Sequence, residues 1–81
     1  MNVRALFFAS YRDIAGADEL PVALPPDADV GTLVQQLRCA GERWQALPPT
    51  PVVAVNMTYA SLSTPLGEGD EVAFIPPVSG G

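Results

Sequence analysis

Short runs of apolar residues, many of them alternating with polar ones, predict a chain built mainly of strands. Segment 2–10 carries apolar side chains on both faces of a strand, with Phe7 on one face and Phe8 on the other, which is typical of a central strand. A shorter alternating run at 20–24 predicts a second strand, which two prolines end. The intervening segment 11–19 is predicted to be a connection.

The apolar spacing changes to that of a helix in the next part of the chain. Four apolar residues recur at the i, i+3, i+4 and i+7 spacing of one buried helix face: Val30, Leu33, Val34 and Leu37. Asp29 stands where a helix N-cap is expected, and Gly41 stands at a position typical of a helix end. We therefore expect one main helix between these two residues.

The C-terminal half returns to strand patterns. Segment 52–56 predicts a strand, the Asn56-Met57 pair a tight turn, and segment 59–62 a short edge strand. Segment 71–76 predicts a last strand with apolar residues on both faces. The order of elements favours an α+β domain, in which a mixed sheet of four to five strands is covered by one main helix.

Composition restricts function more than it restricts fold. Of the 81 residues, 48% are hydrophobic, which suffices for the core of one small domain. The chain has no histidine and no lysine, its four basic residues are arginines, and Cys39 is its one cysteine. These absences exclude Ser-His-Asp and Cys-His catalytic units, a phosphate loop with its lysine, a Schiff-base lysine and the usual zinc sites. Chemistry at this chain therefore needs catalytic groups from a partner.

Charge and hydropathy also bear on partners and location. A net charge of −5 is unfavourable for binding nucleic acid or anionic membranes. No apolar run approaches the ~20 residues of a membrane span. A lone cysteine cannot form an internal disulfide, so we expect a cytoplasmic protein.

The last six residues, PPVSGG, form a distinctive tail. The two prolines end the last strand and stiffen the direction in which the chain leaves it. Two terminal glycines make a tail slim enough for a narrow slot, and a carboxylate lies at its tip. The alternatives are an ordinary frayed terminus or an artefact of expression. We expect a domain over residues 1–76 and a flexible, extended tail over residues 77–81.

At this point the motifs resemble a known family. The run GDEVAFIPPVSGG at 69–81, with VRALFFA at 3–9 and AVN at 54–56, is similar to the sulfur-carrier small subunits of molybdopterin synthase. The resemblance implies a ubiquitin-like β-grasp fold with Gly81 as its working residue. An ATP-dependent activating enzyme would adenylylate the Gly81 carboxylate, and sulfur would then replace an oxygen to give a thiocarboxylate. The large synthase subunit would receive the tail and use the sulfur on cyclic pyranopterin monophosphate during molybdenum cofactor biosynthesis.

The resemblance also implies how the chain meets its partners. It makes this chain a non-catalytic subunit with no permanently bound cofactor and no metal, in a heterotetramer whose large subunit holds the catalytic groups. The partner-binding positions would be Phe7, Tyr59 and Ile75, where the family more often has an aliphatic residue in place of Tyr59 and an aromatic one in place of Ile75. The residues that lead to Gly81 would form the inserted tail: Pro77, Val78, Ser79 and Gly80.

Other functions fit the same tail. The chain would equally suit a sulfur carrier for thiamine thiazole or tRNA thiolation, a ubiquitin-like modifier joined to lysines of other proteins, or an interaction module with an inert tail. Cys39 is a poor candidate for holding sulfur, because the negative end of a helix dipole disfavours its thiolate. The acidic corner at 68–71 is either a solvated turn or a surface that steers the chain toward a basic partner.

Overall fold

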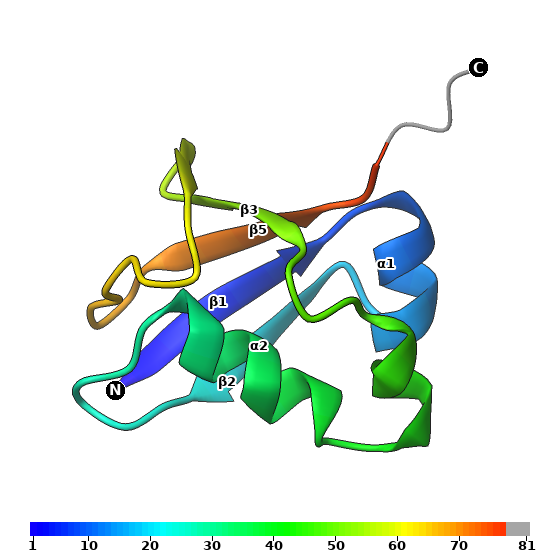
Figure 1. Ribbon diagram of the computed structural model, residues 1–81, viewed down its shortest axis with the longest axis horizontal. Helices are drawn as coiled ribbons and strands as arrows, with labels where there is room; N and C mark the ends of the chain where they lie inside the picture. The colour runs from blue at the N-terminus through cyan, green and yellow to red at the C-terminus, as the bar shows by residue number, and fades with distance from the viewer. Residues whose placement is uncertain (78–81) are drawn as a thin grey trace.

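A five-stranded mixed sheet with helices on one face forms the molecule (Figure 1). The computed structural model describes residues 1–77, so the predictions that concern Val78, Ser79, Gly80 and Gly81 lie outside the described residues. The strands are β1 (Asn2–Phe7), β2 (Glu19–Ala23), β3 (Val52–Val55), β4 (Thr58–Ala60) and β5 (Glu71–Ile75). Their bounds lie close to the predicted strands, although β1 ends three residues earlier than expected.

The sheet order is β2-β1-β5-β3-β4, which places the last strand at the centre beside the first. β1 and β5 are parallel, and every other neighbouring pair is antiparallel. The two strands therefore start at the same end of the sheet and finish at the same end. We call the end where they finish the tail end, because the chain leaves β5 there (Figure 1).

Burial alternates along the central strands. In β5, Val72 and Phe74 are fully buried, whereas the residues between and beside them are only partly covered. β1 lies between β2 and β5, which confirms the prediction of a central strand. It shows the same alternation as β5, so only one of its faces lies in the core. The reason is that the helices cover one face of the sheet and leave the other open.

Three aromatic rings form the middle of the core. Phe7 on β1 stacks on Phe74 of β5, with ring centroids 5.3 Å apart and an interplanar angle of 19°. Trp44 packs against Phe7 at 5.5 Å and 58°. Trp44 lies in η1 (Glu42–Ala46), a 3-10 helix that follows the main helix. These contacts join the two parallel strands to the helical layer.

The main helix, α2 (Val30–Arg38), begins where the sequence predicts. Asp29 accepts a hydrogen bond from the backbone N–H of Thr32 at 2.8 Å, and the Asp29 N–H donates back to the Thr32 hydroxyl at 3.4 Å. This reciprocal capping box holds the pKa of Asp29 below its usual value, because the ionised carboxylate accepts hydrogen bonds from Thr32. The predicted end at Gly41 is wrong, because the helix ends at Arg38 and Gly41 instead precedes η1.

A second α-helix, α1 (Ala9–Ala15), occupies most of the segment predicted to be a connection. It has seven residues and no side-chain N-cap, so the sequence carries neither a long apolar period nor a start signal for it. Gly16 ends it in the left-handed region at φ 74°, where its N–H donates to the Arg12 carbonyl at 2.8 Å. Arg43 donates to the Ala15 carbonyl at 3.2 Å, which ties α1 to η1. Among residues 1–77, no helix is long and apolar enough to cross a membrane.

The β3–β4 hairpin turns as predicted. Asn56 and Met57 both have left-handed backbones, at φ 49° and 73°, which is the conformation of a two-residue hairpin turn that matches the twist of its strands. β4 pairs with β3 alone and lies at the edge of the sheet, as expected.

We expect replacement of Asp29 by alanine to lower the melting temperature at neutral pH, because the α2 N-cap loses its acceptor. A carboxyl whose pKa is depressed in the folded state contributes stability above its unfolded pKa, and that contribution disappears as the pH falls through the folded value. The melting-temperature gap between wild type and D29A should therefore be constant at neutral pH and shrink below about pH 4. Thermal melts followed by circular dichroism, from neutral pH to below about pH 4, test this prediction.

D29N is the control. Its side chain keeps an acceptor oxygen, so its melting temperature should differ from that of the wild type by less than that of D29A. An unchanged gap for D29A at acid pH would contradict the assignment.

Candidate docking face and tail exit

The face of the sheet opposite α2 is covered by no helix, and we call it the open face. The strand register shows which residues share it, because directly paired residues point to the same side of a sheet. Toward the tail end it carries an apolar half: Leu6, Val52, Ala54, Tyr59, Ala73 and Ile75. Its polar half consists of Arg4 and Glu71, which pair with each other farther from the tail end, together with Glu19, which pairs with Leu6 at the β2 edge.

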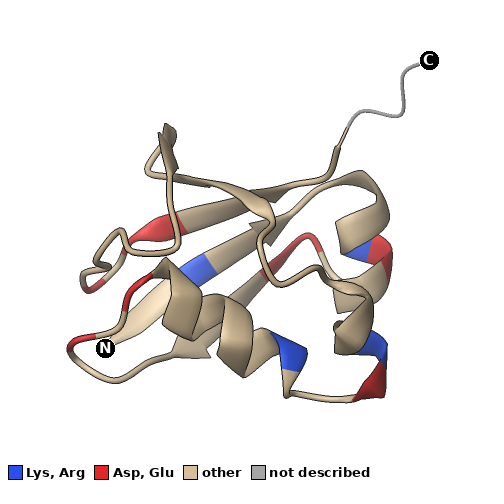
Figure 2. Cartoon of the chain, viewed as in Figure 1, with Lys and Arg blue, Asp and Glu red and all other residues tan. Residues whose placement is uncertain are grey.

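The apolar half is well exposed. Tyr59 has 76% of its surface exposed and Val52 51%, while Ile75 is half-buried between its neighbours. The β3–β4 hairpin and the C-terminal half of β5 carry no charged residue (Figure 2). Met57, 93% exposed, lies at the tip of the same hairpin. An uncharged surface with exposed large side chains is typical of a site where another protein binds.

Phe7 does not belong to this surface. Its ring is 2% exposed and packs between Phe74 and Trp44, so the prediction that Phe7 binds a partner is wrong. The next residue, Phe8, is 50% exposed at the tail end of β1. The sequence held a signal for this, since Arg4 shares the face of the even-numbered residues and a charged side chain on a strand faces solvent. Tyr59 and Ile75 do lie on the open face, and their partner-binding role stays a prediction.

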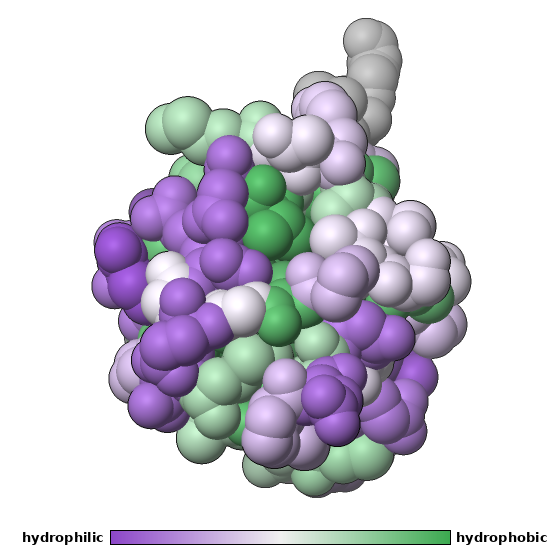
Figure 3. Space-filling view, turned by 90° about the vertical axis from the view of Figure 1, so that its left-hand side faces the viewer, coloured by the Kyte–Doolittle hydropathy of each residue, from purple (hydrophilic) through white to green (hydrophobic). Residues whose placement is uncertain are grey.

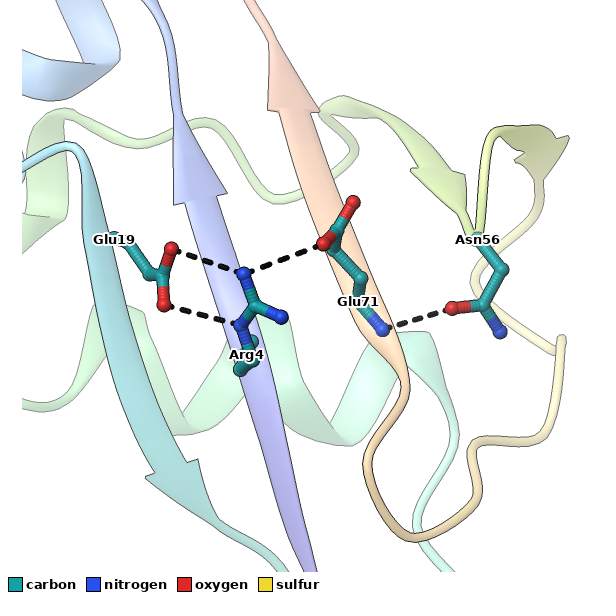
Figure 4. Close-up of polar contacts among 4 residues, drawn as sticks. All are labelled: Arg4, Glu19, Asn56 and Glu71. Atoms are coloured by element: carbon teal, nitrogen blue, oxygen red, sulfur yellow. Dashed lines mark hydrogen bonds and ion pairs between the residues drawn. The ribbon is translucent and has the colours of Figure 1, made fainter.

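Ion pairs organise the polar half (Figure 4). The Arg4 guanidinium donates to both carboxylate oxygens of Glu19, at 3.0 and 3.1 Å, and lies 3.4 Å from Glu71. The three residues thus link β2, β1 and β5 across the open face. The hydrogen bond with Glu19 and its charge raise the pKa of Arg4 above its ordinary value. Arg4 is therefore already engaged by acids of its own chain.

The acidic corner at 68–71 is tied into turns. Asp70 accepts hydrogen bonds from the Gly67 N–H at 2.7 Å and from the Asn56 side chain at 3.0 Å. Asn56 in turn accepts from the Glu71 N–H at 3.0 Å (Figure 4), and Glu68 accepts from the Asn2 N–H at 2.9 Å. Figure 3 shows this end of the molecule, with hydrophilic residues gathered on one side. These contacts favour the interpretation of a structural turn.

The tail exit lies between exposed apolar side chains. Ile75, the last residue of β5, pairs with Val52 of β3, and on the other side β1 runs out beyond Phe7 to Phe8. Pro76 and the exposed Pro77 follow. The described chain thus leaves the centre of the sheet at the margin of the apolar half.

The described residues offer little chemistry of their own. Within residues 1–77, no charged side chain is buried and no group of three or more His, Cys, Asp or Glu residues lies together to hold a metal ion. Cys39 is exposed at the C-cap of α2, where its sulfur accepts a hydrogen bond from the Gln35 side chain at 3.6 Å.

Comparison with known proteins agrees with this geometry. The model of the ThiS family matches residues 5–81, and the chain belongs to this family. The molybdopterin synthase sulfur carrier subunit of Escherichia coli is 43% identical over 84 residues, which cover 98% of this chain and 99% of the relative.

Solved structures show the same fold. SAMP1 from Haloferax volcanii superposes with a TM-score of 0.87 at 29% identity, covering all of both chains. A protein–protein complex of subunits 1 and 2 of the molybdopterin-converting factor from Helicobacter pylori contains a chain with a TM-score of 0.72 at 26% identity, again covering all of both chains. The expected ubiquitin-like β-grasp fold is confirmed, with an additional α-helix, α1, and a 3-10 helix, η1, that the sequence does not predict.

We expect Phe7 and Phe8 to respond in opposite ways to replacement by alanine. F7A removes a fully buried ring from the aromatic core and should cost about 3–5 kcal/mol of unfolding free energy. F8A removes an exposed ring and should cost less than about 1 kcal/mol, because the side chain packs against little. Urea denaturation of the two variants checks both. Equal destabilisation would contradict the burial of one ring and the exposure of the other.

Proposed function

We propose that this chain is the sulfur carrier of molybdopterin synthase, with the Gly81 carboxylate as the group that carries sulfur. The observation that supports it most is the tail exit: the central strand of a sheet runs directly into a Pro-Pro-Val-Ser-Gly-Gly segment beside an exposed, uncharged face. Membership of the ThiS family and the 43% identity with a carrier of this description support the same function.

The chemistry requires activation, because a carboxylate is a poor acyl donor. A carboxylate oxygen of Gly81 would attack the α-phosphorus of ATP and release pyrophosphate, leaving an acyl adenylate. The terminal sulfur of a persulfide held by the activating system would then displace AMP and form an acyl disulfide. A thiol of that system would cleave the S–S bond, which leaves the thiocarboxylate on Gly81 and a disulfide on the activating system. The activating enzyme would supply magnesium and the cationic groups that stabilise phosphate charge, since this chain has no lysine and no phosphate loop.

The open face gives the large synthase subunit a place to dock. A partner that covers Tyr59, Val52 and Ile75 buries exposed apolar surface and receives the tail at the same time, because the exit lies at the margin of these residues. The sulfur would then pass to cyclic pyranopterin monophosphate in the active site of the large subunit. In this role the chain works in the cytoplasm, within a heterotetramer, and holds no resident cofactor.

Intact-mass spectrometry tests the proposal on the chain co-expressed with its activating enzyme. We expect a fraction of chains to show the exchange of one oxygen for sulfur, located by fragmentation at Gly81. Deletion of Gly81 should abolish both this mass change and the formation of molybdopterin. Ser79→Ala is the matched control, because it keeps the length and slimness of the tail. A Gly81 deletion that still supports cofactor synthesis would overturn the proposal.

A ubiquitin-like modifier is the second candidate, because the similar Haloferax volcanii structures include one described as a small archaeal modifier protein. Conjugation would join the Gly81 carbonyl to a lysine of another protein and release water overall. Peptide mapping distinguishes the two functions. The affinity-tagged chain is recovered from cells and digested, and its peptides are identified by mass spectrometry. A lysine peptide branched at Gly-Gly indicates a modifier, whereas unbranched chains with thiocarboxylate indicate a carrier.

A further inference from the structure

A cavity of about 320 Å³ opens beside the tail exit, between the end of β1, the start of α1 and the start of β2. Its apolar wall is formed by Leu6, Phe8 and Ala9. Its polar rim is formed by Arg12, Asp18 and Glu19. Nothing in the proposed chemistry at Gly81 uses this cavity.

The charged side chains of the rim are already engaged in ion pairs. Arg12 pairs with Asp18 at 3.3 Å, and Glu19 accepts two hydrogen bonds from Arg4 at 3.0 and 3.1 Å. Arg4 is shared with Glu71, which lies 3.4 Å away. A charged ligand would have to break one of these pairs, so the cavity suits an uncharged occupant.

The backbone at the cavity keeps Phe8 at the surface. Ala9 has a left-handed backbone at φ 48°, which is uncommon for a residue other than glycine, and it turns the chain from β1 into α1. Phe8, just before this turn, is extended at φ −117° and ψ 151° and is 50% exposed. Uncommon backbone of this kind persists only where the surrounding structure fixes it.

The cavity is continuous with the apolar half of the open face. Leu6 belongs to both, and Phe8 follows β1 into the cavity wall. A partner that covers Tyr59 and Ile75 and reaches across the exit therefore also covers the cavity mouth. Large side chains that fill such pockets at the centre of an interface supply much of its affinity.

We propose that this cavity receives one large, uncharged apolar side chain of the protein that docks on the open face, and so fixes the position of the partner relative to the tail. This inference rests on the proposed function, in which that protein is the large synthase subunit. The occupant would lie against Leu6 and Phe8, and the Arg12–Asp18 pair would border it. The cavity then helps to determine which partner this carrier fits.

Leu6→Trp tests the inference, because tryptophan keeps the open face apolar but fills the cavity. Binding of the large subunit to wild-type and variant chains is measured by isothermal titration calorimetry. If a partner side chain enters the cavity, L6W should raise Kd about tenfold or more. Ala23→Trp is the matched control: Ala23 is exposed at the far end of β2, and A23W should bind as wild type does. The ratio of the L6W and wild-type Kd values should be the same at about 0.05 M and about 0.5 M salt, because an uncharged contact is not screened.

The outcomes separate this inference from the proposed function. If the wild-type chain binds the large subunit and L6W binds with the same Kd, the cavity is not an anchor, and the carrier function still stands. The same conclusion follows if the ratio of the L6W and wild-type Kd values falls as the salt concentration rises. Absence of binding by the wild-type chain overturns both. Should L6W fail to melt cooperatively, backbone NMR of the wild-type chain decides: on addition of the large subunit, the amide signals of Ala9 and Asp18 should shift or broaden, while that of Ala23 should not. Unaffected Ala9 and Asp18 signals overturn the inference.

Discussion

The parallel pairing of β1 with β5 is the contact on which the rest of this molecule depends. It joins the two ends of an 81-residue chain, and it is fixed in register by the Phe7–Phe74 stack directly beneath it. Parallel neighbours must be connected through a long crossover, and here that crossover is nearly the whole domain. β5 lies between β1 and β3, so the strand that leads to the tail is enclosed by the sheet on both sides.

The same pairing divides the molecule into a structural side and a binding side. Every large ring that faces α2 and η1 is used to hold the layers together, and the core is complete without the open face. The open face is therefore free to carry an exposed tyrosine and valine whose packing the fold does not need. A separation of this kind allows exposed residues of the open face, such as Tyr59, to change while stability is kept.

Much of the fold follows from local sequence signals, and the parts that do not have physical reasons. The α2 N-cap, the Asn56-Met57 turn and the five strands each carry a signal that local chemistry fixes. α1 carries none, because seven residues are too few for a helical period to emerge and its C-terminal end is held by Gly16 and by Arg43 from η1. The sequence predicts only part of the open face: Tyr59 and Ile75 lie on it, whereas Phe7 of β1 is buried in the core and Phe8 is exposed instead. Only tertiary packing, or the charge on Arg4, tells which face of that strand is inside. The cavity beside Phe8 depends on α1 and so had no signal in the sequence.

The central position of β5 has a mechanical consequence. A partner that threads a tail into a narrow slot, or withdraws it afterwards, pulls along the axis of the strand to which the tail is attached. That strand is hydrogen-bonded along both edges, to β1 on one side and to β3 on the other, so a pull is opposed by two ladders in shear rather than by one bond at a time. A tail on an edge strand such as β4 would peel away. The domain can thus bear a pulling force at its C-terminal end while it stays folded.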